Sequence, residues 1–370
     1  MPYPIIPIFD QRLPKVMQSH GQPSNPPTDL LQDLLGRALR ELRISVTDRC
    51  NFRCRYCMPR ETFHTEHAFL GPSQLLSFDE ITQLAAALTS LGVEKIRLTG
   101  GEPLLRKNLE TLIASLGDLR TIHGKPLDLA LTTNGSALRH QARALRAAGL
   151  RRITVSLDAM DEAVFQRMSD AASSSARQVL QGIDAAVQAG FEQIKVNMVV
   201  QRGVNDDQIL PMARHFRRMP ISLRFIEYMD VGGSLGWHMA HVVPSTEVLE
   251  CLRNEFELEP LAPQSPSETA QRWRHAQGGG EIGLISSVTQ AFCGECTRAR
   301  LSPEGQLYLC LFAHQGHDLR QLLRSGRNHD EITAAIQAIW SGRADRYSQL
   351  RGQDSLTQRL PKVEMHYIGG

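Results

Sequence analysis

The stretch LRISVTDRCNFRCRYCMP, residues 42–59, carries the pattern that decides the fold of this chain. It opens with LRISVT, an apolar and β-branched run that predicts a buried strand. Three cysteines, Cys50, Cys54 and Cys57, follow in a C-x3-C-x2-C pattern. A buried strand that leads into a loop of closely spaced thiols predicts a functional site at the C-terminal end of that strand.

Strand and helix patterns alternate from this stretch onward. Ser77, with Glu80 three residues later, is typical of a capped helix start. Six strands reached through helical crossovers predict an α/β fold, a parallel sheet curled into a partial (β/α)6 TIM-like barrel. We expect strands at 42–47, 95–99, 128–133, 151–158, 193–200 and 221–229, and helices near 78–92, 106–117, 136–148 and 206–218, with helical segments up to Ala189.

The chain divides into three parts by composition. Seven of the 19 prolines fall in the first 27 residues, which predicts a flexible Pro-rich extension over residues 1–29. The barrel is expected over 30–245, and a C-terminal α+β extension, which carries a further group of three cysteines and ends in Gly-Gly, over 246–370. In this last part we expect a helix over 246–259, an exposed loop over 260–268, strands over 280–287 and 306–310 around a turn at Pro303–Gly305, and helices near 318–325 and 330–341.

Composition and charge narrow the classes of protein that fit. The 41 Lys and Arg residues nearly balance 39 Asp and Glu residues, and a net charge of +2 argues against a general nucleic-acid-coating protein. No apolar run approaches the roughly 18 residues that span a membrane, and no secretion signal opens the chain. Seven cysteines without such a signal indicate the reducing cytoplasm, where clustered thiols bind metal or do chemistry. Cys251 stands apart from the other six, and we expect it to be a buried thiol.

The three thiols after the first strand lie close enough in sequence to face one soft metal centre. A mononuclear zinc site usually has four ligands, so His64 or His67 would supply the fourth. Three cysteines can instead hold three irons of a 4Fe–4S cluster and leave the fourth iron open to a substrate or cofactor. The spacing alone allows both sites.

A second group of three cysteines, Cys293, Cys296 and Cys310, lies far down the chain in a C-x2-C-x13-C pattern. One reading is a small zinc site completed by His314 or His317. The other is a second 4Fe–4S cluster that also lacks one protein ligand, which would suit direct coordination of a substrate.

Between the second and third of these cysteines the sequence reads CTRARL, residues 296–301. Arg298 and Arg300 alternate with Ala299, so a strand would project both guanidiniums to one face. Two guanidiniums beside a metal centre make a site for phosphates or for a purine edge. Solvated surface arginines are the alternative.

The first motif, CNFRCRYC, resembles the signature of radical S-adenosylmethionine enzymes. In that superfamily the open iron holds the methionine end of the cofactor, and one electron from the cluster yields a 5′-deoxyadenosyl radical. LTGGEP, residues 98–103, resembles the segment that holds the methionine amino group, which assigns that role to Gly101. The resemblance also assigns cofactor contacts to Tyr56, Ser156 and Met229. Packing at a strand end is the alternative for the last two.

From Leu39 to Gly370 the chain resembles one narrower family, the molybdenum cofactor biosynthesis protein A or GTP 3′,8-cyclase family of lyases. Other radical enzymes with additional clusters share the first motif but not the second one with its arginines. The resemblance implies two 4Fe–4S clusters, S-adenosylmethionine and the substrate GTP. It is carried by LRISVTDRCNFRCRYCMP, KIRLTGGEPLLR, LTTNG, ITVSLD, IKVNMVV, LRFIEYMD, FCGECTRARL and KVEMHYIGG.

The family also implies which residues bind GTP, and they lie on or at the ends of expected strands. Lys195 sits among apolar residues, where an unpaired ammonium would be costly, so it needs a partner. A triphosphate would be one partner and a nearby carboxylate is the alternative. The backbone and small side chain of Ala299 would fit between the two arginines. The implied set is Arg43, Arg97, Thr132, Lys195, Arg298, Ala299 and Arg300.

In this family the radical removes hydrogen from C3′ of the ribose, and the C3′ radical attacks C8 of the guanine. Reduction and protonation give (8S)-3′,8-cyclo-7,8-dihydroguanosine 5′-triphosphate. The family's double-glycine tail is thought to reach the active site, so Gly369 and Gly370 join Arg298 and Arg300 as implied catalytic residues. A frayed terminus and a tail for carboxylate activation are the alternatives.

The resemblance further implies a reducing electron donor, a homodimer, and cyclic pyranopterin monophosphate synthase as the next enzyme of the pathway. It implies no nucleic acid and no membrane as partners. Two rival hypotheses remain on the sequence: a non-catalytic zinc or RNA-binding protein, and another radical enzyme that acts on a peptide or a tRNA.

Overall fold

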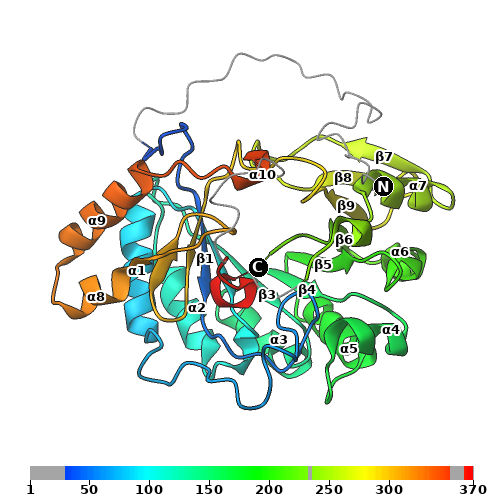
Figure 1. Ribbon diagram of the computed structural model, residues 1–370, viewed down its shortest axis with the longest axis horizontal. Helices are drawn as coiled ribbons and strands as arrows, with labels where there is room; N and C mark the ends of the chain where they lie inside the picture. Colours follow the sequence, from blue (N-terminus) through cyan, green and yellow to red (C-terminus); the bar gives the residue numbers. More distant parts are fainter. Residues whose placement is uncertain (1–29, 232–235, 351–361, 370) are drawn as a thin grey trace.

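The computed structural model describes residues 30–231, 236–350 and 362–369, so the expected extension over 1–29 lies outside the described residues. One twelve-stranded sheet runs through the described chain in the order β12-β11-β10-β1-β2-β3-β4-β5-β6-β9-β8-β7. The strands curve around α11 (Met365–Ile368), and the helices α1 to α7 lie outside them (Figure 1).

The first six strands are parallel and follow one another in chain order, as expected. The expected strands at 95–99, 128–133 and 193–200 agree with the observed ones at both ends. The other three are shorter by one to three residues. The bounds are Glu41–Ser45 (β1), Lys95–Thr99 (β2), Asp128–Thr133 (β3), Arg152–Ser156 (β4), Gln193–Val200 (β5) and Ile221–Glu227 (β6).

Helical crossovers connect these strands. The first begins with the expected capping box, in which Ser77 accepts from the Glu80 amide at 3.1 Å and the Glu80 carboxylate accepts from the Ser77 amide at 2.8 Å. The expected helix near 206–218 is a short 3₁₀ turn at Asp206–Gln208 followed by α6. The α-helices of this part are Phe78–Ser90 (α1), Leu109–Asp118 (α2), Leu138–Ala147 (α3), Glu162–Ser169 (α4), Ala176–Gln188 (α5) and Ile209–Phe216 (α6).

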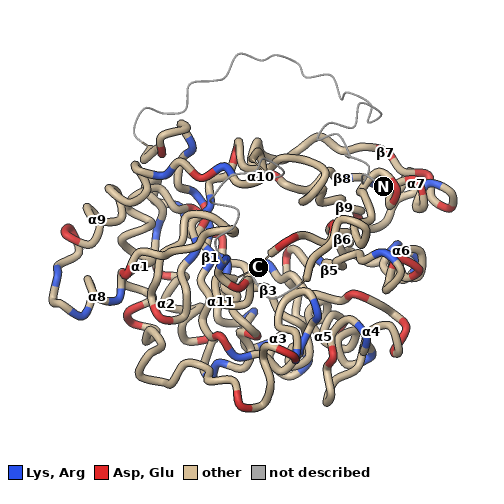
Figure 2. Tube along the Cα trace, in the orientation of Figure 1, with Lys and Arg blue, Asp and Glu red and all other residues tan. Residues whose placement is uncertain are grey.

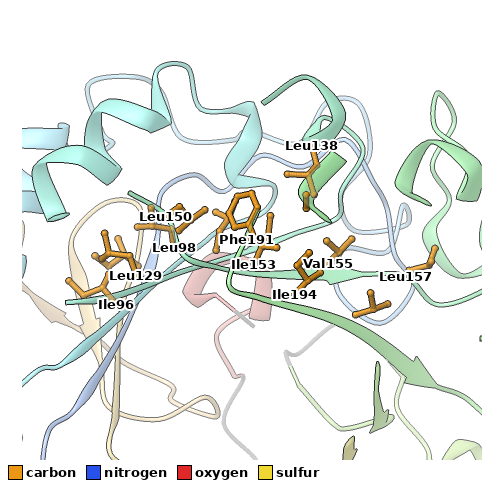
Figure 3. Close-up of a cluster of buried hydrophobic side chains, with 14 of the residues drawn as sticks. Ile96, Leu98, Leu129, Leu138, Leu150, Ile153, Val155, Leu157, Phe191 and Ile194 are labelled. Carbon is orange, nitrogen blue, oxygen red and sulfur yellow. The ribbon is translucent and has the colours of Figure 1, made fainter. Parts of the chain in front are cut away.

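Apolar residues at alternate strand positions form the core between the sheet and the helices. Ile96 and Leu98 of β2, Leu129 of β3, and Ile153 and Val155 of β4 are all at most 3% exposed and lie in one cluster (Figure 3). Burial of each such side chain stabilises the fold by about 1.5–3 kcal/mol. The residues between them in sequence project to the opposite face, which is the concave side of the sheet.

The C-terminal part adds strands to both edges of the parallel sheet. β9 pairs with β6, and β10 pairs with β1, both in parallel register. The expectation that 280–287 and 306–310 form strands around the Pro303–Gly305 turn was wrong in its pairing, because β10 and β11 flank that turn. These strands are Glu281–Ile285 (β9), Arg298–Leu301 (β10), Gln306–Tyr308 (β11) and His317–Asp318 (β12).

The remaining elements correct two further expectations. The helix expected over 246–259 ends at Arg253, and Leu258–Leu261 is a strand, β7, that takes up the start of the expected loop. The strand β8, Gln271–His275, was not predicted. The other helices are Ser245–Arg253 (α7), Leu319–Arg324 (α8), His329–Ser341 (α9), Tyr347–Leu350 (α10) and Met365–Ile368 (α11). No helix among the described residues has the length and apolar character needed to cross a membrane.

Candidate active site

The first cysteine triad lies in the loop that follows β1, at the C-terminal end of the parallel strands. Burial raises the pKa of Cys50 to about 12 and also raises the pKa values of Cys54 and Cys57 well above the ordinary thiol value. The neighbouring thiols contribute, since Cys50 and Cys57 each raise the pKa of Cys54. The structure therefore brings the three thiols into mutual electrostatic contact, as the spacing indicated.

Polar groups from the next two strands surround Cys50. The amide nitrogen of Asn134 lies 3.8 Å from the Cys50 Sγ, and the Phe52 N–H donates to the same sulfur at 3.4 Å. Behind them the buried Glu102 carboxylate accepts from the Thr133 hydroxyl at 2.6 Å and from the Asn134 N–H at 2.7 Å. Burial raises the pKa of Glu102 to about 7. Asn134 thus contacts Cys50, and Glu102 fixes the Asn134 backbone; neither role was predicted.

The residues expected to contact a cofactor lie around the same loop. The Tyr56 hydroxyl donates to Asp158 at 2.7 Å, which ties the triad loop to the segment after β4. Ser156 is the last residue of β4, on the same face as Thr154. Met229 follows β6 and packs beside a buried cluster that contains Cys310.

Gly101 packs directly against the triad loop. Its N–H donates to the Thr47 carbonyl at 2.8 Å, and a Cβ at this position would lie 2.3 Å from the Arg49 carbonyl oxygen. Only glycine therefore allows this close approach. The contact gives Gly101 a packing reason in addition to the cofactor role that the sequence indicated.

The second cysteine triad lies between the β9 and β12 regions, with Cys293 and Cys310 buried and Cys296 half-buried. The Ser348 hydroxyl donates to the Cys293 Sγ at 2.8 Å, and the Ser348 N–H lies 3.2 Å from it. Burial, and then Asp345 and the other two thiols, raise the pKa of Cys310 to about 12. Cys293 and Cys296 therefore lie within electrostatic range of Cys310. The seventh cysteine, Cys251, is half-buried rather than buried.

No group of three or more His, Cys, Asp or Glu side chains in the described ranges is close enough to hold a metal ion. The chemistry of both triads nevertheless fits an iron–sulfur group, because each offers three soft sulfur donors and N–H groups directed at a sulfur. A cavity of about 330 Å³ opens beside the first triad and is lined by Cys50, Asn51, Arg53, Arg60, Phe63, His64, Thr65, Asp170 and Ala172.

A row of cationic side chains crosses the concave face of the sheet between the two triads. Arg43 of β1 pairs in register with Arg300 of β10 on one side and with Arg97 of β2 on the other. Arg97 donates to the Thr132 hydroxyl at 3.1 Å and to the Thr154 hydroxyl at 3.0 Å. Blue stretches of the tube along β1 and its neighbours mark this row (Figure 2). Arg43, Arg97 and Thr132 therefore lie on adjoining strands, and the CTRARL arginines lie on the next strand along.

One carboxylate, Glu41, lies within this row. It accepts from Arg298 at 3.0 Å, and its other oxygen lies 3.6 Å from the Arg43 Nε. Burial alone would raise the pKa of Glu41, but the surrounding cations, led by Arg298, hold it well below its ordinary value. Burial and the nearby Arg298 in turn lower the pKa of Arg300 to about 10. The four arginines Arg43, Arg97, Arg298 and Arg300 therefore outnumber Glu41.

Lys195 of β5 extends the row, and its ammonium has no hydrogen bond or ion pair among the described residues. Burial, and then the nearby cations with Arg224 first, lower its pKa to about 7. The carboxylate partner considered as an alternative is therefore not found in the described part of the chain. This arrangement leaves a cationic site that is ready for an anion.

One expectation for these strands is wrong, and two cationic residues on them were not predicted. Ala299 is fully buried in the apolar core and pairs with Leu42, so its side chain does not lie between the two arginines. Strand alternation is the reason, since Ala299 faces away from its neighbours. Lys95 and Arg224 share the concave face with the predicted set but were not predicted. Their alternation with apolar residues in KIRLT and ISLRF was the signal available.

The C-terminal tail enters the concave side of the sheet. The Arg300 guanidinium donates to the carbonyls of Ile368 and Gly369. Gly369 has φ +73°, and a Cβ there would lie 2.2 Å from the Thr99 Cγ2. The tail is therefore not a frayed end up to Gly369, while Gly370 lies outside the described residues.

Comparisons with known proteins agree with this architecture. A family model described as Radical SAM superfamily matches residues 44–216, and one described as Molybdenum Cofactor Synthesis C matches residues 221–349. The solved structure of Streptococcus suis SuiB bound to S-adenosylmethionine is similar in fold, with a TM-score of 0.55, 12% identity, and coverage of 82% of this chain and 69% of that chain. Fold and first triad define a radical SAM protein, a class that uses a 4Fe–4S cluster and S-adenosylmethionine.

Relatives narrow this class. The GTP 3′,8-cyclase of Acidothermus cellulolyticus is 51% identical, over 93% of this chain and 100% of that protein. The GTP 3′,8-cyclase of Staphylococcus saprophyticus is 48% identical, over 92% and 99%. The chain belongs to the GTP 3′,8-cyclase family, radical SAM enzymes of molybdenum cofactor biosynthesis. Membership decides against both rival hypotheses, the zinc or RNA-binding protein and the radical enzyme for a peptide or tRNA.

Proposed function

We propose that this chain converts GTP to (8S)-3′,8-cyclo-7,8-dihydroguanosine 5′-triphosphate in a partial barrel that holds two 4Fe–4S clusters. The observation that carries the proposal is the cationic row on β10, β1 and β2, which lies between the two cysteine triads. One triad follows β1, and the other flanks β10. A substrate with a triphosphate at one end and a purine at the other matches this arrangement.

The first triad, Cys50, Cys54 and Cys57, would hold the cluster that binds S-adenosylmethionine. When bound, this pair supplies a 5′-deoxyadenosyl radical. Around it the chain would orient the cofactor through four residues of the loop and strand ends. We assign this role to Tyr56, Gly101, Ser156 and Met229.

The second triad, Cys293, Cys296 and Cys310, would hold the cluster that faces the guanine. Cations on the concave face would hold the triphosphate, so both ends of GTP would be pinned before bond formation. The binding residues are Arg43, Lys95, Arg97, Thr132, Lys195, Arg224, Arg298 and Arg300, with Ala299 contributing its backbone only.

Gly369 and Gly370 would act beside Arg300 during the reaction. The carbonyl groups of Ile368 and Gly369 accept from the Arg300 guanidinium, so the tail and a substrate phosphate would share one donor. Binding of GTP would therefore be coupled to the position of the tail.

The remaining parts of the proposal concern partners. We infer a homodimer of the reducing cytoplasm that takes electrons from a reducing donor. Its product would pass to cyclic pyranopterin monophosphate synthase, and neither nucleic acid nor membrane would take part.

Anaerobic turnover tests the function. Reconstituted protein with reductant, S-adenosylmethionine and GTP should yield 5′-deoxyadenosine and the cyclised nucleotide. Arg298→Ala and Arg300→Ala should lower GTP turnover at least tenfold with unchanged iron content. Arg40→Ala serves as the control, because Arg40 forms a surface pair with Glu94. Cofactor cleavage that leaves GTP unchanged in the parent protein would refute the substrate assignment.

A further inference from the structure

A buried carboxylate, Asp33, lies between two guanidiniums from opposite ends of the chain. The Arg37 Nε and Nη2 atoms each lie 2.7 Å from the Asp33 Oδ2, and the Arg343 Nη1 lies 3.1 Å from it. The side chains of Asp33, Arg37 and Arg343 are 0%, 3% and 1% exposed. These residues have no part in the reaction described above.

Both guanidiniums also reach the backbone of the second cysteine triad. Arg37 donates to the Cys293 carbonyl at 2.8 Å, and Arg343 donates to the Cys296 carbonyl at 2.8 Å. The Arg343 Nε donates to the carbonyl of Leu309, the residue before Cys310, at 3.1 Å. A guanidinium therefore donates to the carbonyl of Cys293, to that of Cys296, and to that of Leu309, which precedes Cys310.

The network is itself held rigidly. The other Asp33 oxygen accepts from the Leu35 and Arg37 N–H groups, both at 2.9 Å. The Arg343 guanidinium stacks over Trp340 at 4.6 Å, and the Trp340 indole N–H donates to the Arg37 carbonyl at 3.1 Å. The two guanidinium groups are therefore held in fixed positions.

We propose that Asp33, Arg37 and Arg343 form a clamp that positions Cys293, Cys296 and Cys310 as ligands of the second cluster. The clamp rests on the proposed function, which supplies that cluster. A planar guanidinium can bind several acceptors in a set geometry, whereas a lysine offers a single point charge. The clamp fixes the backbone around cysteines from both sides of β10 in one geometry.

The physical argument concerns the cost of burying these charges. A buried ion pair is often no more stabilising than an apolar replacement of similar volume, so stability alone does not account for two buried arginines on one carboxylate. Carbonyl groups in a metal-binding loop cannot pair with one another in regular structure and need donors from elsewhere. The clamp supplies these donors, and it makes residues 33–37 part of the second triad's site.

The test uses Arg37→Lys and Arg343→Lys, which keep the positive charge but lose the planar guanidinium with its several donors. Asp33→Asn is a third variant. After anaerobic reconstitution, iron should fall from about eight to about four per chain. The electron paramagnetic resonance signal of the second cluster should be lost, while the first cluster still cleaves S-adenosylmethionine. Arg40→Lys is the control, since Arg40 lies on the same segment and forms only the surface pair with Glu94, at 3.5 Å.

A second readout needs no cluster. In the metal-free protein, N-ethylmaleimide should modify Cys293, Cys296 and Cys310 at least tenfold faster in the lysine variants than in the parent. The first triad and Cys251 should react at unchanged rates. If the parent binds only about four irons, the proposal of a second cluster is refuted. The alkylation rates then still show whether the clamp holds the loop.

Two results would overturn the clamp. One is that both lysine variants keep the parent's iron content, second-cluster signal and alkylation pattern. The other is that they expose both triads equally and lose their circular dichroism signal, which would show a general role in folding.

Discussion

Lys195 offers a direct test of the triphosphate site through its protonation. Its pKa in the free protein is about 7, because burial and then Arg224 disfavour the charged form. The charged form is therefore present below pH 7 and is lost as the pH rises above it. A phosphate placed against the ammonium favours the charged form and raises the pKa toward its ordinary value. Binding of GTP should then take up a proton.

The size of the effect follows from this pKa. With a free-state pKa of about 7, binding should take up about 0.9 proton at pH 8 and about 0.1 at pH 6. The affinity should weaken about tenfold between pH 6 and pH 8, or about 1.4 kcal/mol. Lys195→Met removes a charge-assisted hydrogen bond worth about 1.5–3 kcal/mol, so at pH 6 it should weaken binding between about tenfold and about 150-fold.

Isothermal titration calorimetry of GTP binding, without reductant or S-adenosylmethionine, measures both quantities. Titrations in two buffers of different ionisation enthalpy give the protons taken up. The phosphate of GTP itself titrates near about pH 6, and Lys195→Met reports that background. Lys125→Met, at an exposed position, is the matched control. The reasoning fails if Lys195→Met takes up as many protons as the parent at pH 8, or binds GTP with equal affinity.

Three further predictions follow from contacts near the site. Ser348→Ala removes a hydroxyl donor to the Cys293 sulfur, so the reduction potential of the second cluster should become more negative in spectroelectrochemical titration, with iron content unchanged. Gly369→Ala places a Cβ 2.2 Å from the Thr99 Cγ2 and should lower turnover with both clusters intact. Adding Thr99→Ser, which removes that methyl, should restore part of the rate if steric contact is the cause. Leu98→Ala, at a core position 1% exposed, should lower the free energy of unfolding by about 2–5 kcal/mol in urea titration, and a loss below 1 kcal/mol would contradict the core assignment.

Local sequence patterns predicted the parallel sheet well. Strands β2, β3 and β5 agree with the expected ranges at both ends, because short apolar runs bounded by turn residues define them. The Ser77 capping box was predicted for the same reason, since it involves residues three positions apart.

The pairing of strands that are distant in sequence could not be predicted from local sequence patterns. β9 and β10 join opposite edges of the sheet although they are near neighbours in sequence. The strand β8 was missed because QRWRH alternates charged and aromatic residues without a long apolar run. Pairing at a sheet edge depends on which partner the tertiary fold presents, and this is not encoded in the local period.

The sequence by itself determined the chemistry that the chain carries: two sets of three thiols, paired arginines and a glycine tail, each defined by spacing over a few residues. Only the tertiary structure decided how these parts meet. It placed Glu41 among the arginines, buried Ala299 in the core, and left the Lys195 ammonium without a partner in the part of the chain that the structure describes. It also joined Asp33 to Arg343 across 310 residues. Spacing sets which groups are near in the chain, whereas burial and strand register set which charges share one low-dielectric space.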